Sequence, residues 1–184
     1  MDMKRETRLY GENLILRPVE LSDVNDDYVR WMNDREVNQY METRFRPQTR
    51  KDIETYVGSM IQKPNVHFFA ILFKESSRHI GNIKLEVTSS IHRRGEISLF
   101  VGEKEHWGKG LASEAICLVR DFGIKDLGLH KLTAGCYSNN QGSARAFEKA
   151  GFLREAVLRG EYLCEGAWVD RYCYAFIAQI TEAS

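Results

Sequence analysis

The segment from Trp107 to Ala112 has the composition of a phosphate-binding turn. It reads Trp-Gly-Lys-Gly-Leu-Ala and lies between an apolar run ending at Val101 and a strong helical pattern. Glycines let successive backbone N–H groups converge, and the N-terminus of the following helix adds partial positive charge. Lys109 places a full positive charge at the rim of the turn. This combination binds anions, most often phosphates.

Two common nucleotide-binding motifs do not fit this segment. A Walker motif needs four residues between its glycines and a Ser or Thr after Lys, but five residues separate Gly102 from Gly108, and Gly110 follows the lysine. The dinucleotide motif G-x-G-x-x-G fails because Ser113 takes the third glycine position. The turn therefore predicts a phosphate ligand of another kind.

The elements that must position this turn follow from apolar periodicity. Ser22 and Thr49 are placed to cap helices, and Gly110 stands near the start of a further helix predicted from about Lys109. Strands are expected near residues 14–17, 66–73, 83–87, 96–101, 132–137, 152–163 and 168–177, and helices near 22–32, 37–41, 49–63, 109–127 and 141–150. Such an order predicts an α/β (α+β) layer with a mixed, mostly antiparallel sheet.

The strand before the turn has two distinct faces. Ile97, Leu99 and Val101 share one face, whereas Glu96, Ser98 and Phe100 share the other. Glu96 therefore lies on the same face as Phe100, from which its side chain could point into a cleft.

The composition of the chain limits the classes of protein to which it could belong. The 184 residues predict one domain, residues 1–184, and 26 basic against 26 acidic residues give a formal net charge of zero. This balance argues against nucleic acid or an anionic membrane as a partner. The four cysteines show no C-x-x-C spacing, so neither a metal site nor a redox motif is expected. A charged N-terminus and the lack of a long apolar run predict a cytoplasmic protein.

Four segments at their mutual spacing resemble the GCN5-related N-acetyltransferase (GNAT) superfamily, in particular its branch of RimJ/RimL-like ribosomal-protein N-terminal acetyltransferases. The resemblance covers nearly the whole chain. The segments are Glu96 to Val101, Trp107 to Ala115, Asn140 to Ser143, and Glu148 to Phe152.

The resemblance implies a GNAT fold with about seven strands, and acetyl-coenzyme A as cofactor. The backbone amides of the turn would hold the pyrophosphate, the strand before it would run beside the pantetheine arm, and Asn140 would contact the cofactor from a later strand–helix junction. The cofactor-binding residues implied are Leu99, Phe100, Val101, Trp107, Gly108, Lys109, Gly110, Leu111, Ala112, Asn140 and Ser143. Trp107 replaces the usual Gln or Arg of the family and is typical of the Rim-type branch.

Catalytic candidates are fewer and leave alternatives open. Many members of the superfamily protonate the leaving thiolate with a tyrosine, but that position is Phe147 here. The resemblance points instead to Ser143 as the acid. Tyr137, on the neighbouring strand, is a further donor, and the alternative is that no dedicated acid exists, because a thiolate is a tolerable leaving group. An amine must lose a proton before it attacks a thioester, so a base is needed. Glu96 on its strand and Glu161, at an acidic position of Rim-type enzymes, are the two candidates.

The implied activity is direct transfer of an acetyl group to a primary amine in a ternary complex. The acceptor would be a protein N-terminal amine or a small-molecule amine, such as an amino sugar on a nucleotide carrier, whose anionic part Arg44 and Arg46 could bind. The alternative is a catalytically inactive coenzyme-A-binding regulatory module. A monomer or homodimer is expected.

Overall fold

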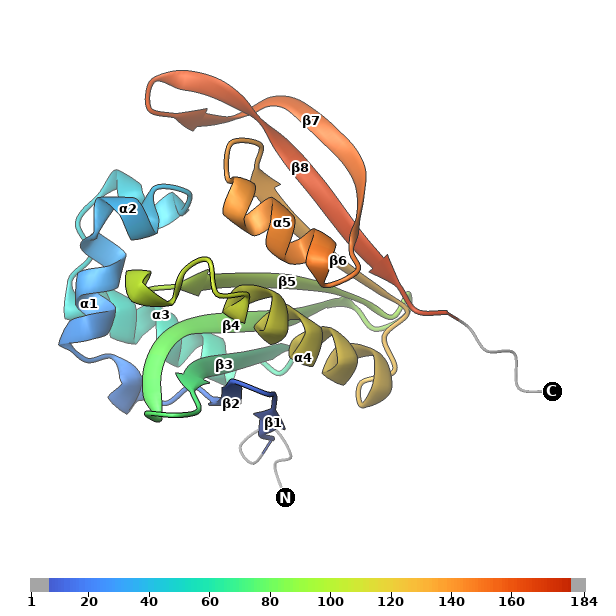
Figure 1. Cartoon of the computed structure of the whole chain (residues 1–184), viewed down its shortest axis with the longest axis horizontal. Coiled ribbons are helices and arrows are strands. Elements are labelled where there is room, and N and C mark those ends of the chain that lie inside the picture. Colours follow the sequence, from blue (N-terminus) through green and yellow to red (C-terminus); the bar gives the residue numbers. More distant parts are fainter. Residues whose placement is uncertain (1–6, 180–184) are drawn as a thin grey trace.

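The strands form one mixed sheet. The structure, a computed structural model, describes residues 7–179. Its eight strands follow the order β1-β2-β3-β4-β5-β6-β8-β7 (Figure 1), and all neighbours are antiparallel except β5 and β6. The strands are β1 (Leu9–Tyr10), β2 (Leu14–Pro18), β3 (Val66–Phe73), β4 (Arg78–Ser89), β5 (Arg94–Val101), β6 (Lys131–Tyr137), β7 (Leu153–Cys164) and β8 (Ala167–Ile177).

The predicted mixed, mostly antiparallel sheet is confirmed. The strand beyond the expected seven is β1, whose two residues are too few to show alternation. The helices are α1 (Asp26–Asn33), α2 (Arg35–Asn38), α3 (Arg50–Gln62), α4 (Leu111–Lys125) and α5 (Gln141–Lys149), with short 3-10 turns η2 (Leu21–Asp23), η3 (Glu42–Phe45) and η4 (Lys104–His106). No helix in residues 7–179 is long and apolar enough to cross a membrane.

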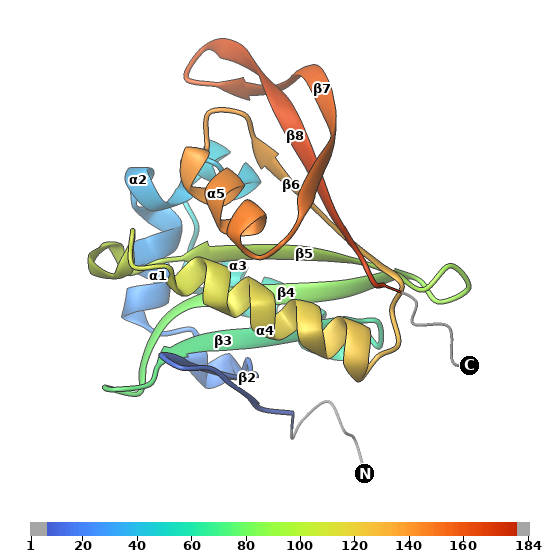
Figure 2. The ribbon, with the colours of Figure 1, turned by 45° about the vertical axis from the view of Figure 1, so that its right-hand side comes forward.

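Two hydrophobic clusters cover the two faces of the sheet. One joins the sheet to α4 and α5 and includes Ile97, Ile116 and Phe147. The other joins it to α1 and α3 through Trp31 and Val57. In Figure 2, α4 lies in front of the sheet and α3 behind it. The sheet is therefore the middle layer of three.

The helix caps were only partly predicted. Thr49 caps α3 as expected, because its side chain accepts a hydrogen bond from Asp52 N. Ser22 does not cap α1. It lies in the 3-10 turn η2, and Asn25 caps the helix by accepting from Tyr28 N at 3.0 Å. The start of α4 was placed two residues early, since Gly110 takes a left-handed φ of 80° and the helix begins at Leu111.

The parallel strands β5 and β6 are paired over only a short stretch. Its three residue pairs join Arg94, Gly95 and Glu96 to residues 131–133 of β6. Beyond Glu96 the register pairs β5 with β4 alone, up to Val101. The two strands therefore separate in the middle of the sheet, as Figure 2 shows where β6 and α5 rise away from β5.

The direction of the β5 peptide groups follows from alternation along the strand. Gly95 O accepts from the Thr133 hydroxyl on the β6 side, at 3.2 Å. Gly102 N donates to Ile80 O on the β4 side, at 2.8 Å. Peptide groups of successive residues point to opposite neighbours. Leu99 and Val101, in phase with Gly95, therefore direct their N–H and C=O groups into the opening between β5 and β6.

Candidate active site

Two cavities meet where β5 and β6 separate. One, of about 630 Å³, lies between the β5–α4 loop, α2 and the start of α5. The other, of about 430 Å³, lies on the side of α1, η3 and α3. The residues that line both are Tyr40, Met41, Leu99, Phe100 and Ser143. A ligand in each cavity would thus reach the same point beside β5.

The larger cavity gathers the residues predicted to bind the cofactor. Leu99, Phe100, Val101, Trp107, Gly108, Gly110, Leu111, Ala112, Asn140 and Ser143 line it. Lys109 does not, and its residue is exposed beside the turn. Arg145 and Lys149 also line the cavity and supply the positive charge near its α5 wall.

The β5–α4 loop has the geometry of an anion cradle. Gly108 and Gly110 take φ values of 73° and 80°, and a Cβ added at either would meet nothing within 4 Å. The backbone conformation, rather than crowding, is what requires glycine here. The indole Nε1 of Trp107 donates to Val101 O at 2.8 Å, which fixes the loop to the end of β5. The loop thus presents backbone groups and open space toward the cavity. This arrangement is suited to binding a pyrophosphate.

Ser143 stands at the junction of the two cavities. Its backbone N donates to Asn140 Oδ1 at 3.0 Å, the cap of α5, and its residue is half-buried. The thiol of Cys136 lies beside it. Burial raises the pKa of Cys136 to about 11, although the Ser143 hydroxyl opposes the shift. The thiol is therefore protonated at neutral pH. Two hydroxyls lie at this junction, that of Ser143 and that of Tyr40, which donates to Asn139 O at 3.3 Å.

Two positions near Ser143 do not supply a free proton: Phe147, which replaces the tyrosine of many family members, and Tyr137, the other candidate donor. Phe147 is buried and stacks on Tyr174 with ring centroids 6.0 Å apart. The Tyr137 hydroxyl donates to Glu42 Oε1 at 2.6 Å and accepts from Arg44 Nη1 at 2.9 Å. Burial and the neighbouring Glu42 carboxylate raise the pKa of Tyr137 to about 12. Its proton is held within that network, which weakens the reading of Tyr137 as a donor.

The two candidate bases are brought together around one arginine. Glu96 belongs to the last pair of the β5–β6 ladder, where the opening begins. Glu161 comes from β7, two strands beyond β6. Arg171 of β8 lies 3.9 Å from Glu96 Oε1 and 4.0 Å from Glu161 Oε1. Phe100 packs against Tyr28 of α1, 5.7 Å between centroids, so the predicted Glu96–Phe100 face is the α1 side of the sheet.

Arg44 has a structural role rather than the anion-binding role proposed from the sequence. Its guanidinium donates to Met41 O at 2.8 Å, to the Tyr137 hydroxyl and to Leu163 O at 2.7 Å. These contacts join η3 to β6 and β7. Arg46 is exposed and lies 3.7 Å from Asp52. Neither arrangement is an open anion site.

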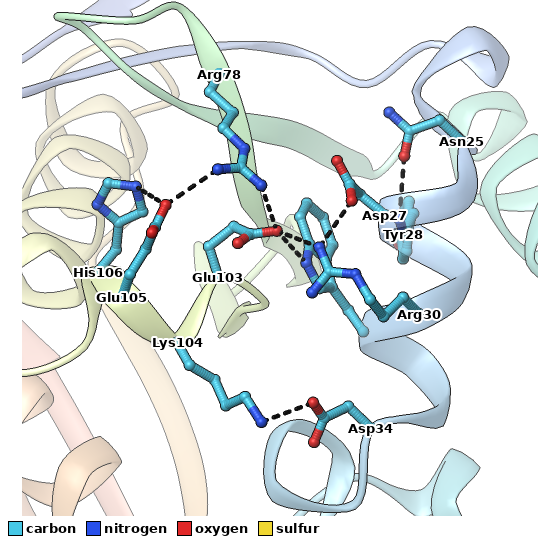
Figure 3. A network of polar contacts seen from close by, with 11 residues as sticks. Asn25, Asp27, Tyr28, Arg30, Asp34, Arg78, Glu103, Lys104, Glu105 and His106 are labelled. Carbon is cyan, nitrogen blue, oxygen red and sulfur yellow. Dashed lines mark hydrogen bonds and ion pairs between the residues drawn. The ribbon is translucent and has the colours of Figure 1, made fainter.

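Glu103 is a residue whose role the sequence did not reveal. Its buried carboxylate Oε1 accepts from Trp31 Nε1 at 2.8 Å and from Arg30 Nη2 at 2.6 Å, and lies 3.2 Å from Arg78 Nη2 (Figure 3). A Cβ at Gly102 would overlap the Trp31 ring at 2.2 Å, so glycine is needed for this approach. The network fixes α1 to the chain just before the cofactor loop.

A second contact extends this network to the wall of the larger cavity. Lys104 Nζ lies 2.8 Å from Asp34 Oδ2, at the cap of α2 (Figure 3). Glu36 and Val37 of α2 line the cavity. The loop and the facing helix are therefore held together through neighbouring residues.

Comparison with known proteins gives the family to which this fold and site belong. A model of the acetyltransferase (GNAT) domain matches residues 13–153. An uncharacterized N-acetyltransferase, p20, of Bacillus licheniformis is 30% identical over 171 residues, covering 92% of this chain and 95% of p20. The chain belongs to the GNAT acetyltransferase family.

Solved structures support the same fold. Spermidine N-acetyltransferase from Vibrio cholerae, solved with CoA and spermine, has a TM-score of 0.79 at 24% identity, covering 91% of this chain and 96% of that one. Mycobacterium smegmatis RimJ, in complex with CoA-disulfide, has a TM-score of 0.77 at 20% identity, covering 93% of this chain and 85% of that one. The protein is an N-acetyltransferase that uses acetyl-CoA, and an inactive regulatory module is not favoured.

The left-handed conformation of Gly110 gives a direct test of the cradle. Alanine at φ 80° costs about 1–2 kcal/mol, so we expect Gly110→Ala to distort the loop and weaken CoA binding about tenfold by calorimetry. Gly166 is the matched control. It has the same φ of 80°, has nothing within 4 Å of an added Cβ and lies in the β7–β8 turn. Equal CoA affinity in Gly110→Ala and Gly166→Ala would contradict the assignment.

The Glu103 network predicts that Glu103 and the nearby Glu105 contribute differently to the free energy of unfolding. Glu103→Gln removes the buried charge that faces Arg30 and Arg78, so the free energy of unfolding should fall by about 2 kcal/mol. Glu105→Gln alters only an exposed ion pair with Arg78, so it should change the free energy of unfolding little. Urea denaturation of both variants measures this, and equal losses would argue against a special role for Glu103.

Proposed function

We propose that this N-acetyltransferase acetylates a primary amine by direct transfer in a ternary complex, with the cofactor in the larger cavity and the amine in the smaller. The observation that carries the proposal is the junction of the two cavities at Leu99, Phe100 and Ser143. It lets both substrates reach one point without a covalent enzyme intermediate.

In the proposed complex the cofactor follows the opening between β5 and β6. Bound acetyl-CoA supplies the acetyl group as a thioester. The loop amides near Gly108 and Gly110 bind its pyrophosphate. The peptide group of Leu99 and the N–H of Val101 hydrogen bond to the pantetheine amides, because Val101 O already accepts from Trp107 Nε1. Asn140 borders the same cavity from the cap of α5. Lys109 contributes charge from the rim.

The chain's own residues then handle the protons. Glu96 or Glu161 receives the proton of the attacking amine, directly or through water. A backbone N–H near Leu99 stabilises the negative charge that develops on the carbonyl oxygen. Ser143 gives a proton to the departing thiolate and takes one back from solvent, which restores its hydroxyl. Its position at the cavity junction supports this role. The buried Phe147 has no proton to give, and the Tyr40 hydroxyl, also at the junction, donates to Asn139 O.

The acceptor we propose is a small-molecule amine or a protein N-terminal amine, the latter as in the RimJ/RimL-like branch. A cavity of about 430 Å³ is of a size that accommodates small ligands. Its walls carry both signs of charge, with Glu42 and Asp52 as well as Arg46 and Lys84. An amino sugar on a nucleotide carrier receives less support than the sequence suggested, because Arg44 is bound within the protein.

The decisive experiment is release of free thiol from acetyl-CoA with a panel of polyamines, amino sugars and ribosomal-protein N-terminal peptides. We expect turnover with a primary amine and none with its tertiary analogue. Tight CoA binding without turnover of any amine would instead favour a regulatory module.

Ser143 can be tested on whichever amine is turned over. Ser143→Ala should lower kcat by about a hundredfold, the usual contribution of a proton donor. Ser113→Ala is the control, because Ser113 lines the same cavity from the first turn of α4. If both variants keep the parent kcat, Ser143 is not the acid.

A further inference from the structure

We propose that Tyr40 is a specificity-determining residue, which commits the acetyl group to the amine by keeping water away from the thioester. This inference rests on the proposed function, in which acetyl-CoA and the amine meet where the two cavities join. Its consequence can be measured as a ratio. Nearly every thiol that the parent enzyme releases should be matched by one acetylated amine, and that match should depend on the Tyr40 ring.

Three elements enclose the junction of the two cavities. Leu99 and Phe100 of β5 line it on one side, and Ser143 of α5 lines it on another. Tyr40 and Met41, which connect α2 to η3, also line both cavities. In Figures 1 and 2, α2 lies beside the start of α5, above the end of β5. The α2–η3 connection therefore covers the junction from the side of the N-terminal helices.

The Tyr40 side chain reaches from this connection to the β6–α5 side of the opening. Its hydroxyl donates to Asn139 O at 3.3 Å, and its ring packs on the ring of Tyr137 with centroids 5.6 Å apart. Tyr137 is the last residue of β6, and Asn139 lies in the turn that leads to α5. The ring thus bridges the N-terminal helices and β6 beside the junction.

The chain on both sides of Tyr40 is held in place by hydrogen bonds. Asn38 is buried, and its Nδ2 donates to Met32 O at 2.8 Å. Met41 N donates to Asn38 O at 2.8 Å, and Met41 O accepts from Arg44 Nη1, also at 2.8 Å. Tyr40 therefore belongs to a fixed wall of the junction rather than to a loose loop.

Water is the nucleophile that competes with the amine at this point. Attack of the amine breaks the C–S bond of the thioester and forms a C–N bond, and overall a proton of the amine replaces the acetyl group on sulfur. Attack of water breaks the same bond but forms a C–O bond, which yields acetate, the thiol and a proton. A base that deprotonates an amine also deprotonates water, so the base alone does not favour the amine. Exclusion of water from the site prevents this side reaction.

An aromatic ring is suited to this role. It fills space between the α2–η3 connection and β6 while offering water few hydrogen-bonding partners. Tyr40 is half-buried, and its one polar side-chain atom already donates to Asn139 O. Burial raises the pKa of Tyr40, so the hydroxyl keeps its proton at neutral pH and adds no charge that would attract water. Removal of the ring should therefore admit water to the thioester.

The fate of the acetyl group gives the test. Acetyl-CoA labelled in its acetyl carbon, incubated with an amine that the parent enzyme acetylates, lets NMR measure acetate and acetylated amine in one sample. We expect Tyr40→Ala to raise the ratio of acetate to acetylated amine about tenfold. Tyr40→Phe should keep the parent ratio, because it retains the ring. Phe45→Ala is the matched control, since Phe45 is an aromatic residue of the adjoining η3 that is 64% exposed and lines neither cavity.

The outcomes separate the ring from the hydroxyl and from the fold. Met41→Ala removes the other side chain of the same wall and decides the question if Tyr40→Ala does not fold. An unchanged ratio in a variant that keeps the parent melting temperature would overturn the inference and leave the proposed function intact. A large loss of kcat in Tyr40→Phe without added acetate would assign the hydroxyl to proton transfer and overturn it as well. If the parent acetylates no amine, the proposed function fails, and the inference fails with it.

Discussion

The site depends on one constraint, the loss of pairing between two parallel strands inside a continuous sheet. β5 and β6 share three residue pairs and then separate, although each remains bound to its other neighbour. Leu99 and Val101 consequently turn peptide groups toward an opening rather than toward a strand. Backbone groups at such a place need partners. A ligand with amide groups of its own can complete the strand edge, as the pantetheine arm of CoA does in our proposal.

The opening is supported on each side by one charged side chain, the buried Glu103 and the half-buried Arg44. Glu103 binds Trp31 and Arg30 and so fixes α1 to the end of β5. Arg44 binds Tyr137 and Leu163 O and so fixes η3 to β6 and β7. Each contact joins residues more than seventy positions apart in the chain, at separations of 72 to 119. The N-terminal helices are thereby held over the acceptor cavity.

Local pattern was enough to predict the loop and the strand that border the larger cavity, whereas the binding of the cofactor by their residues stays a prediction. The glycines of Trp107–Ala112 and the alternation of β5 depend on residues next to one another, and the structure places them as expected around one cavity. The β7 and β8 strands were likewise predicted to within one residue at each end. Ser22 was misassigned because a Ser before an apolar run looks like a cap, whereas the 3-10 turn places Asn25 at that position.

The acceptor side could not be predicted in the same way. Arg171 of β8 lies near Glu96 of β5 and Glu161 of β7, which are far apart in the chain. Its fit depends on Gly135 of β6, where an added Cβ would lie 2.6 Å from Arg171 Nε. Arg44 looked like a free cation because its partners, Tyr137 and Leu163 O, lie far along the chain. Residue type alone cannot show which charges are already paired. Those pairings arise from the tertiary fold.

The most direct measurement is amide NMR of the cofactor-free protein during titration with CoA. We expect the largest shifts at the Leu99 and Val101 N–H groups and in the loop from Gly108 to Leu111, with smaller shifts on β1 and β2 at the far side of the sheet. Shifts confined to another surface, or the absence of binding, would contradict placement of the cofactor in the opening between β5 and β6.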